Sequence, residues 1–150
     1  MKLFLLAAAL ISATPALGAP KTIFACKLGL KSAKVTLEQG RFIYRYGTAK
    51  KAELTLAGSG AVGNVTAYQG RHASILRQIR FTNGGVSYIL YSMGASSTAD
   101  TRDVSGLSVV RGGKLVSDQS CKPFAEFTAG FEALDALPQD EDSWSAMSLG

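Results

Sequence analysis

The sequence predicts a mainly β fold: a single antiparallel β-barrel or sandwich of eight to nine strands with a short C-terminal helix. Three observations support this prediction. The middle of the 150-residue chain consists of short segments rich in β-branched and aromatic residues, which favour strands. Turn signals that contain glycine separate these segments, among them Asn83-Gly84-Gly85 and Arg111-Gly112-Gly113. After Cys121 the spacing of apolar residues changes to that of a helix.

The N-terminal segment has the layout of a secretory signal peptide. Met1-Lys2 is followed by an apolar run and then by small residues, and Ala16-Leu17-Gly18 predicts cleavage after Gly18. The apolar run is shorter than the roughly 20 residues that span a bilayer. We therefore expect a periplasmic or secreted protein with no integral membrane segment once 1–18 is removed. Two alternatives stay open: a retained anchor, and lipidation at Cys26.

The β-rich domain is expected to occupy residues 19–137 together with the helix. In the segment "RFIYRYG", residues 41–47, alternation places Phe42, Tyr44 and Tyr46 on one face of a strand and the arginines on the other. The rings are then expected in the core, rather than on an exposed stacking platform. The nine predicted strands are 21–27, 33–38, 41–47, 52–57, 62–68, 74–82, 86–92, 104–110 and 114–120.

The predicted helix follows Pro123 and ends before Pro138. Its apolar stripe is expected to pack on the β-domain, with docking on a partner as the alternative. Residues 138–150 are acidic and polar, and they predict a flexible tail. Trp144 within this tail leaves open a peptide that docks onto a partner. The stripe consists of Phe124, Phe127, Phe131, Leu134 and Leu137.

The two cysteines, Cys26 and Cys121, are expected to pair in an oxidising compartment. The absence of a CxxC spacing disfavours a redox-active thiol. Residues 21–120 carry fourteen Lys/Arg against five Asp/Glu, a balance of +9, while residues 121–150 carry one Lys against six acids, a balance of −5. A basic exported domain can meet anionic envelope components by long-range steering, although plain solubility also accounts for the charge.

No recognised chemical motif accompanies this charge. His72 is the single histidine, so a zinc site would lack its usual ligands, and no G-x-S-x-G or phosphate-cradling loop is present. We therefore predict no enzyme, no catalytic residue, no metal and no cofactor. Nucleic acid is not an expected partner, because the signal peptide directs the chain away from it.

The candidate binding residues are basic side chains and loop residues. The loop 93–103 is longer than most loops of a compact domain, which makes it a fair place for function. The basic candidates are Arg41, Arg45, Arg71 and Arg77, together with Arg102 in that loop.

Two resemblances bear on function. "YRYGTAKKAELTL", "FTNGGVSYILYS" and a late "GGK…C" resemble a group of small exported bacterial proteins with one disulfide, which implies location and a β-rich fold but no activity. More distantly, the chain is similar to periplasmic inhibitors of C-type lysozyme, whose loops carry Ser-Gly-x-x-Tyr and Tyr-x-x-Gly motifs. Here Ser59-Gly60 is followed by Gly63 in place of tyrosine, whereas Tyr91 to Gly94 matches the second motif.

These observations predict an exported, non-enzymatic binding module that recognises an envelope component, such as a polymer, or a secreted or periplasmic protein partner. The alternative is a proteinaceous inhibitor of a secreted hydrolase, either resembling the lysozyme inhibitors or acting as an immunity protein. It would act through loops 58–63 and 93–103.

Overall fold

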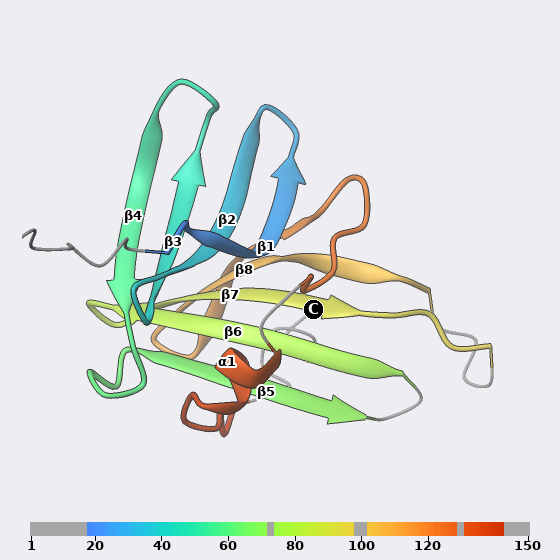
Figure 1. Ribbon diagram of the computed structural model, residues 1–150. Helices are drawn as coiled ribbons and strands as arrows, with labels where there is room; N and C mark the ends of the chain where they lie inside the picture. Colours follow the sequence, from blue (N-terminus) through green and yellow to red (C-terminus); the bar gives the residue numbers. More distant parts are fainter. Residues whose placement is uncertain (1–17, 72–73, 98–101, 129–130, 143–150) are drawn as a thin grey trace, which may run out of the picture.

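The computed structural model describes residues 18–71, 74–97, 102–128 and 131–142. Within these ranges the chain forms nine strands and one helix (Figure 1). Each strand coincides with a predicted one, and the largest offset is at β5, where residues 60–63 form a turn in place of the first predicted strand residues. The elements are β1 (Lys21–Leu28), β2 (Lys31–Glu38), β3 (Arg41–Gly47), β4 (Ala52–Gly58), β5 (Val65–Arg71), β6 (Ile75–Asn83), β7 (Val86–Met93), β8 (Val104–Arg111), β9 (Lys114–Ser120) and α1 (Phe131–Asp135).

The strands form two antiparallel sheets, and each sheet is a simple meander. The first sheet has the order β1-β2-β3-β4 and the second has the order β5-β6-β7-β8-β9. The strands of the two sheets cross steeply in Figure 1. Because the described strands pair only within their own sheet, the fold is an open sandwich and not a closed barrel. This decides between the two architectures that the sequence left open.

One core lies between the sheets. Tyr44 of the first sheet and Phe81 of the second are both fully buried, and their ring centroids lie 5.5 Å apart. Aromatic pairs at this separation add to the stabilisation from burial. Phe42 is buried too, and Tyr46 is partly buried against the same cluster. The prediction that the rings of "RFIYRYG" belong to the core is confirmed.

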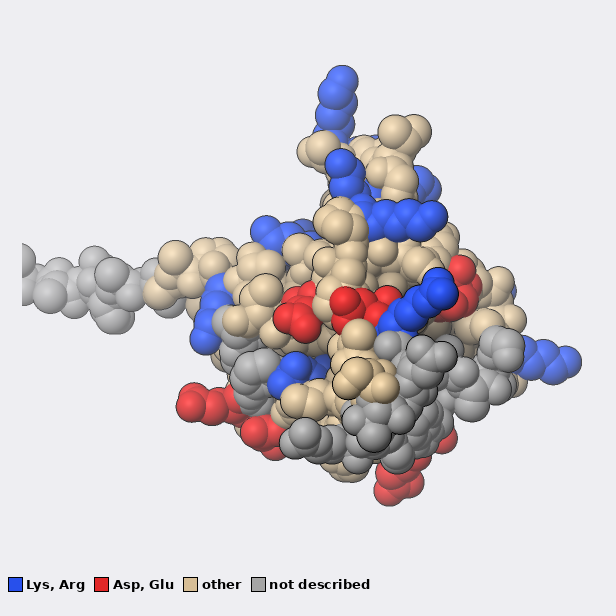
Figure 2. All heavy atoms as spheres, turned by 90° about the vertical axis from the view of Figure 1, so that its right-hand side faces the viewer, with Lys and Arg blue, Asp and Glu red and all other residues tan. Residues whose placement is uncertain are grey.

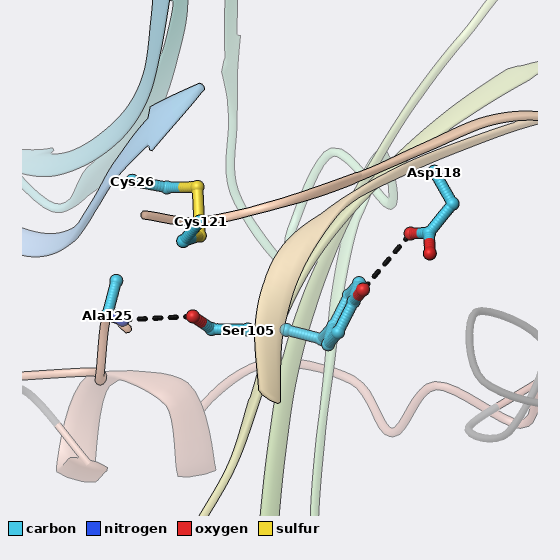
Figure 3. The surroundings of a disulfide bond; sticks show 6 residues. Cys26, Ser105, Asp118, Cys121 and Ala125 are labelled. Carbon is cyan, nitrogen blue, oxygen red and sulfur yellow. Dashed lines mark hydrogen bonds between the residues drawn. A yellow bond between two sulfur atoms is a disulfide. The ribbon is translucent and has the colours of Figure 1, made fainter. Parts of the chain in front are cut away.

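The predicted disulfide between Cys26 and Cys121 is present and joins the two halves of the sandwich. Cys26 lies in β1, and Cys121 directly follows β9. The amide of Cys121 donates to the carbonyl of Ser105 at 2.8 Å. The hydroxyl of Ser105 in turn accepts from the amide of Ala125 at 2.9 Å (Figure 3). The chain is therefore bonded to Ser105 of β8 both at Cys121 and four residues beyond it, at Ala125.

The C-terminal helix is shorter than its apolar stripe predicts. Residues 122–128 are not helical, and only α1, a helix of five residues, follows them. The backbone of this stretch bonds elsewhere, since the amide of Thr128 donates to the carbonyl of Ile23 at 3.1 Å. Phe127 and Leu134 are nevertheless buried in the core. Phe127, Leu134 and Leu137 of the stripe pack on the β-domain as predicted, but Phe124 and Phe127 lie in an irregular segment and not in a helix.

The described part of the expected tail, residues 138–142, is held against the edge strand β5. The amide of Ala67 donates to the carbonyl of Pro138 at 3.0 Å, and the amide of Asp140 donates to the carbonyl of Ala67 at 2.8 Å. These bonds cover part of an edge that would otherwise present unpaired backbone groups. Residues 138–142 thus belong to the folded domain.

A buried ion pair fixes this segment. The carboxylate of Asp140 is 5% exposed and accepts from Nε of Arg80 at 2.8 Å. The side-chain amide of Gln78 donates to the same carboxylate oxygen. The acidic composition of 138–150 predicted an exposed tail. Composition does not reveal that the buried Arg80 pairs with Asp140. Trp144 and the rest of 143–150 lie outside the described residues.

Candidate functional site

The turns of the two hairpins in the first sheet lie side by side. β1 turns into β2 at Gly29 and Leu30, and the φ of +65° at Gly29 suits the first position of a type II′ turn. β3 turns into β4 through residues 48–51. β2 and β3 pair Ser32 with Gly47, each next to its turn. Both turns therefore project from the same end of the sheet (Figure 1).

Lysines gather at this end of the molecule. Residues 21–58, which make up the first sheet and its turns, carry eight Lys/Arg and two Glu, a balance of +6. Figure 2 shows basic side chains standing at the top, above the acidic ones. We call this surface the hairpin face and define it by Lys27, Leu30, Lys31, Lys34, Lys50 and Lys51.

One lysine of the hairpin face is engaged within the protein. Nζ of Lys31 lies 2.7 Å from Oε2 of Glu53 and 5.3 Å from the ring centroid of Tyr46. The hydrogen bond to Glu53 raises the pKa of Lys31 above its ordinary value, so this ammonium stays charged. Lys31 thus braces the β1–β2 turn against the neighbouring hairpin.

The other lysines of the hairpin face are exposed. In the described part of the chain, the ion pairs of the first sheet are those of Lys31 with Glu53 and of Arg45 with Glu38. Lys27, Lys50 and Lys51 therefore keep their ammonium groups available to an external anion. Lys34 also has no carboxylate at salt-bridge distance within these residues, although it lies close enough to Glu38 to lower the pKa of that carboxyl.

An open hollow of about 370 Å³ lies beside the β1–β2 turn. Its walls combine small apolar side chains with lysine stems, and Leu30 stands at its rim with 95% of its surface exposed. The residues with polar side chains that line it are Lys27, Lys31, Lys34 and Ser32. The hairpin face therefore offers positive charge and apolar surface together.

Two of the predicted arginines lie on β3, which runs toward the hairpin face and ends there at Gly47. Arg41 is exposed at the start of the strand. Arg45 donates to Glu38 Oε1 at 2.8 Å and to Thr36 Oγ1 at 3.0 Å. The hydrogen bonds from Arg45, followed by that from Thr36, hold the pKa of Glu38 below its usual range. Arg45 is therefore committed to an internal pair and Arg41 is not adjacent to the turns.

Two other predicted residues, Arg77 and Gly94, meet at one end of the second sheet. They line a polar pocket of about 280 Å³ together with Ser74, Ser92 and Glu126. Nε of Arg77 donates to Oε1 of Gln69 at 3.2 Å. Burial lowers the pKa of Arg77, while the nearby carboxylate of Glu126 opposes this shift.

The remaining predicted residues are scattered. Arg71 ends β5, and nothing is described of its side chain. Arg102 is exposed beside Asp103, whose carboxylate accepts from the amide of Ala95 at 2.6 Å. His72 and residues 98–101 of the predicted loop lie outside the described residues.

Tyr91 is a packing residue. It is 6% exposed on the face of the second sheet that points away from the first, and its hydroxyl donates to Asp118 at 3.0 Å. Burial, reinforced by Asp118, raises the pKa of this phenol. Its side chain has little surface left for a partner.

The described ends of the two loops proposed for an inhibitor lie at opposite ends of the second sheet. Ser59 and Gly60 follow β4 at one end of the second sheet, where Pro138 lies against Gly60. The loop after Met93 leaves the opposite end, because Met93 pairs with Leu76 whereas Val65 pairs with Phe81. Figure 1 shows the two connections far apart.

The described residues contain no group of three His, Cys, Asp or Glu side chains placed to hold a metal ion. In the same ranges, no helix has the length and apolar character needed to cross a membrane. The geometry thus defines a mainly β, disulfide-linked sandwich with a basic hairpin face. No family model, curated protein or solved structure matches this chain significantly.

Sequence reasoning missed the hairpin face itself. It singled out five arginines, of which only Arg41 and Arg45 alternate with aromatic rings, whereas the exposed cations at the turns of the first sheet are lysines. The stretch "KLGLK", residues 27–31, carried a usable signal, since it places a leucine in a two-residue turn between lysines. That turn has no Asn-Gly or Gly-Gly pair, so it did not stand out among the turn signals.

Proposed function

We propose that this protein is an exported, non-enzymatic binding module that recognises an anionic envelope component through the hairpin face. The observation that carries the proposal is the cluster of exposed lysines at the adjacent turns of the first sheet, which have no carboxylate partner among the described residues. The ammonium group of lysine acts as a point charge, so it can bind phosphate or carboxylate without requiring one fixed geometry. The target class is therefore an anionic surface or polymer.

Two features support export. The signal peptide expected at 1–18 would direct the chain out of the cytoplasm. The disulfide between Cys26 and Cys121 is of a kind that persists in oxidising compartments. If export occurs as proposed, the protein recovered from the exported fraction has the mass of residues 19–150. A full-length mass in the cytoplasmic fraction would contradict this part of the proposal.

The exported protein is then tested for sedimentation with vesicles of phosphatidylglycerol in phosphatidylcholine, and for retention on immobilised dextran sulfate. A lysine near an anionic surface contributes about 1 kcal/mol. The double substitution Lys50→Gln/Lys51→Gln should therefore weaken binding by about 2 kcal/mol, roughly thirtyfold. Raising the salt concentration should weaken binding of the unsubstituted protein steeply, because salt screens exposed charges.

The matched control is Arg111→Gln/Lys114→Gln. These two residues are exposed at the tip of another hairpin, between β8 and β9, and their replacement changes the net charge equally. The control should bind within about threefold of the unsubstituted protein. Equal losses in both double variants would show that net charge, and not the hairpin face, governs binding.

Inhibition of a secreted hydrolase is the weaker proposal. It relied on loops 58–63 and 93–103 entering one enzyme, and these loops leave opposite ends of the second sheet. Retention of one soluble enzyme at equal stoichiometry, unaffected by Lys50→Gln/Lys51→Gln, would favour it over binding through the hairpin face.

A further inference from the structure

Leu30 is the most exposed large apolar residue that the structure describes. It occupies the second position of the two-residue β1–β2 turn and is 95% exposed. The conformation of the turn depends on the positive φ of Gly29 and places no demand for leucine at the next position. A polar residue would serve there equally well, so the turn itself does not account for this side chain.

The surroundings of Leu30 combine two kinds of chemistry. Lys31 follows it directly, and Lys27 and Lys34 line the same hollow. The same hollow is also walled by Ala25, Ala33 and Ala49, and its exposed surface is more apolar than polar. Lysine stems can lie along apolar surface while their ammonium groups stay in a polar layer.

This combination matches the boundary of a lipid bilayer. An anionic headgroup layer attracts lysines, and the acyl region directly below it receives apolar side chains. A dissolved polyanion would satisfy the lysines equally well, but it has no apolar phase for Leu30. Both turns project beyond their strands in Figure 1, so Leu30 on the β1–β2 turn can enter the acyl boundary while the lysines of the adjacent turn meet the headgroups.

We propose that the hairpin face docks on an anionic phospholipid bilayer, with Leu30 inserted beneath the headgroup phosphates that the surrounding lysines contact. This inference rests on the proposed function and narrows its anionic target to a lipid surface. Lys50 and Lys51 on the adjacent turn supply further phosphate contacts, so that the two turns act as one footprint.

The test compares Leu30→Ser with the unsubstituted protein on the same two probes, phosphatidylglycerol-containing vesicles and dextran sulfate. Burial of a leucine side chain predicts a loss of about tenfold to a hundredfold in vesicle binding. Binding to dextran sulfate should stay unchanged. The matched control is Val62→Ser, because Val62 is 73% exposed on the β4–β5 loop, at the other end of the first sheet. It should leave both kinds of binding unchanged.

A second variant reports insertion directly. Leu30→Trp in a Trp144→Phe background should shift its fluorescence to the blue on vesicles that contain phosphatidylglycerol, and brominated lipid should quench it. Neither change should follow the addition of dextran sulfate. Vesicle binding by Leu30→Ser at unsubstituted strength, or an unshifted Leu30→Trp spectrum on bound protein, would overturn insertion while leaving the hairpin face as an anion-binding surface. Failure to bind either probe would overturn both proposals.

Discussion

The substitution Asp140→Ala should lower the free energy of unfolding by more than the replacement of an exposed acidic residue ordinarily does. Asp140 and its partner Arg80 have side chains that are only 5% and 10% exposed. The substitution removes the carboxylate that lies 2.8 Å from Nε of Arg80, and Gln78 loses an acceptor as well. Removing one member of a buried ion pair costs about 3–5 kcal/mol. The free energy of unfolding of a typical domain is about 5–15 kcal/mol in total, so a loss of this size is easily measured.

The assay is equilibrium unfolding in guanidinium chloride, with the free energy of unfolding obtained by linear extrapolation. Asp142→Ala is the matched control, because Asp142 contacts Arg80 and Asp140 through its backbone, which alanine retains. It should change the free energy by less than about 0.5 kcal/mol. Replacing both partners, in Arg80→Met/Asp140→Leu, should recover much of the loss. A cost below about 1 kcal/mol for Asp140→Ala would refute the assignment of 138–142 to the folded domain.

Three further predictions concern stability and ionisation. Tyr44→Phe should stabilise the protein by about 1 kcal/mol in denaturant unfolding, because the buried hydroxyl finds no hydrogen-bond partner in the described structure; a loss of stability would show that it has one. Removing both Cys26 and Cys121 should cost about 4–5 kcal/mol, as estimated for a closed loop of this length, and a cost below about 1 kcal/mol would contradict that estimate. A carbon-13 NMR titration should find the pKa of Glu38 below its usual value of about 4.3. The ionised Glu38 carboxylate then stabilises the protein fully at pH values above the usual pKa, and this stabilisation is lost as the pH falls through the lowered pKa. The substitution Arg45→Met should raise the pKa of Glu38.

Local chemistry made the strands predictable. The segment "RFIYRYG" alternates so regularly that the buried and exposed faces of β3 followed from period two alone. Glycines in the turns marked most of the hairpins. The disulfide was predictable because the chain has only two cysteines and the expected export places them in an oxidising compartment. The choice between barrel and sandwich depends on whether β1 and β4 meet other strands across the fold, and residue patterns within single strands carry no information on that.

The C-terminal region shows where local patterns failed. The stripe from Phe124 to Leu137 has helical spacing. The amide of Thr128 donates to the carbonyl of Ile23, and that of Ala125 donates to the hydroxyl of Ser105, which holds residues 124–128 in a non-helical path. Likewise, the charge of Asp140 indicates exposure unless its partner, sixty residues away in the sequence, is known. Both outcomes depend on tertiary contacts that outweigh propensity.

The candidate site was only partly predictable for a similar reason. Charge counting located the basic character in the body of the chain, but pairing decides which cations remain available. Arg45 is engaged by Glu38, whereas Lys50 and Lys51 are not engaged by any described carboxylate. That distinction requires the register between β2, β3 and β4, which also brings the two turns together.

The central claim is that the hairpin face is the binding surface of this protein. A nitrogen-15 NMR titration of the protein comprising residues 19–150 with small bicelles that contain phosphatidylglycerol tests this directly. We expect the amide signals of residues 27–34 and 47–52 to shift or broaden first, while those of 111–114 stay unchanged. Perturbations centred on the pocket of Arg77 and Gly94, or on no region of the first sheet, would contradict it.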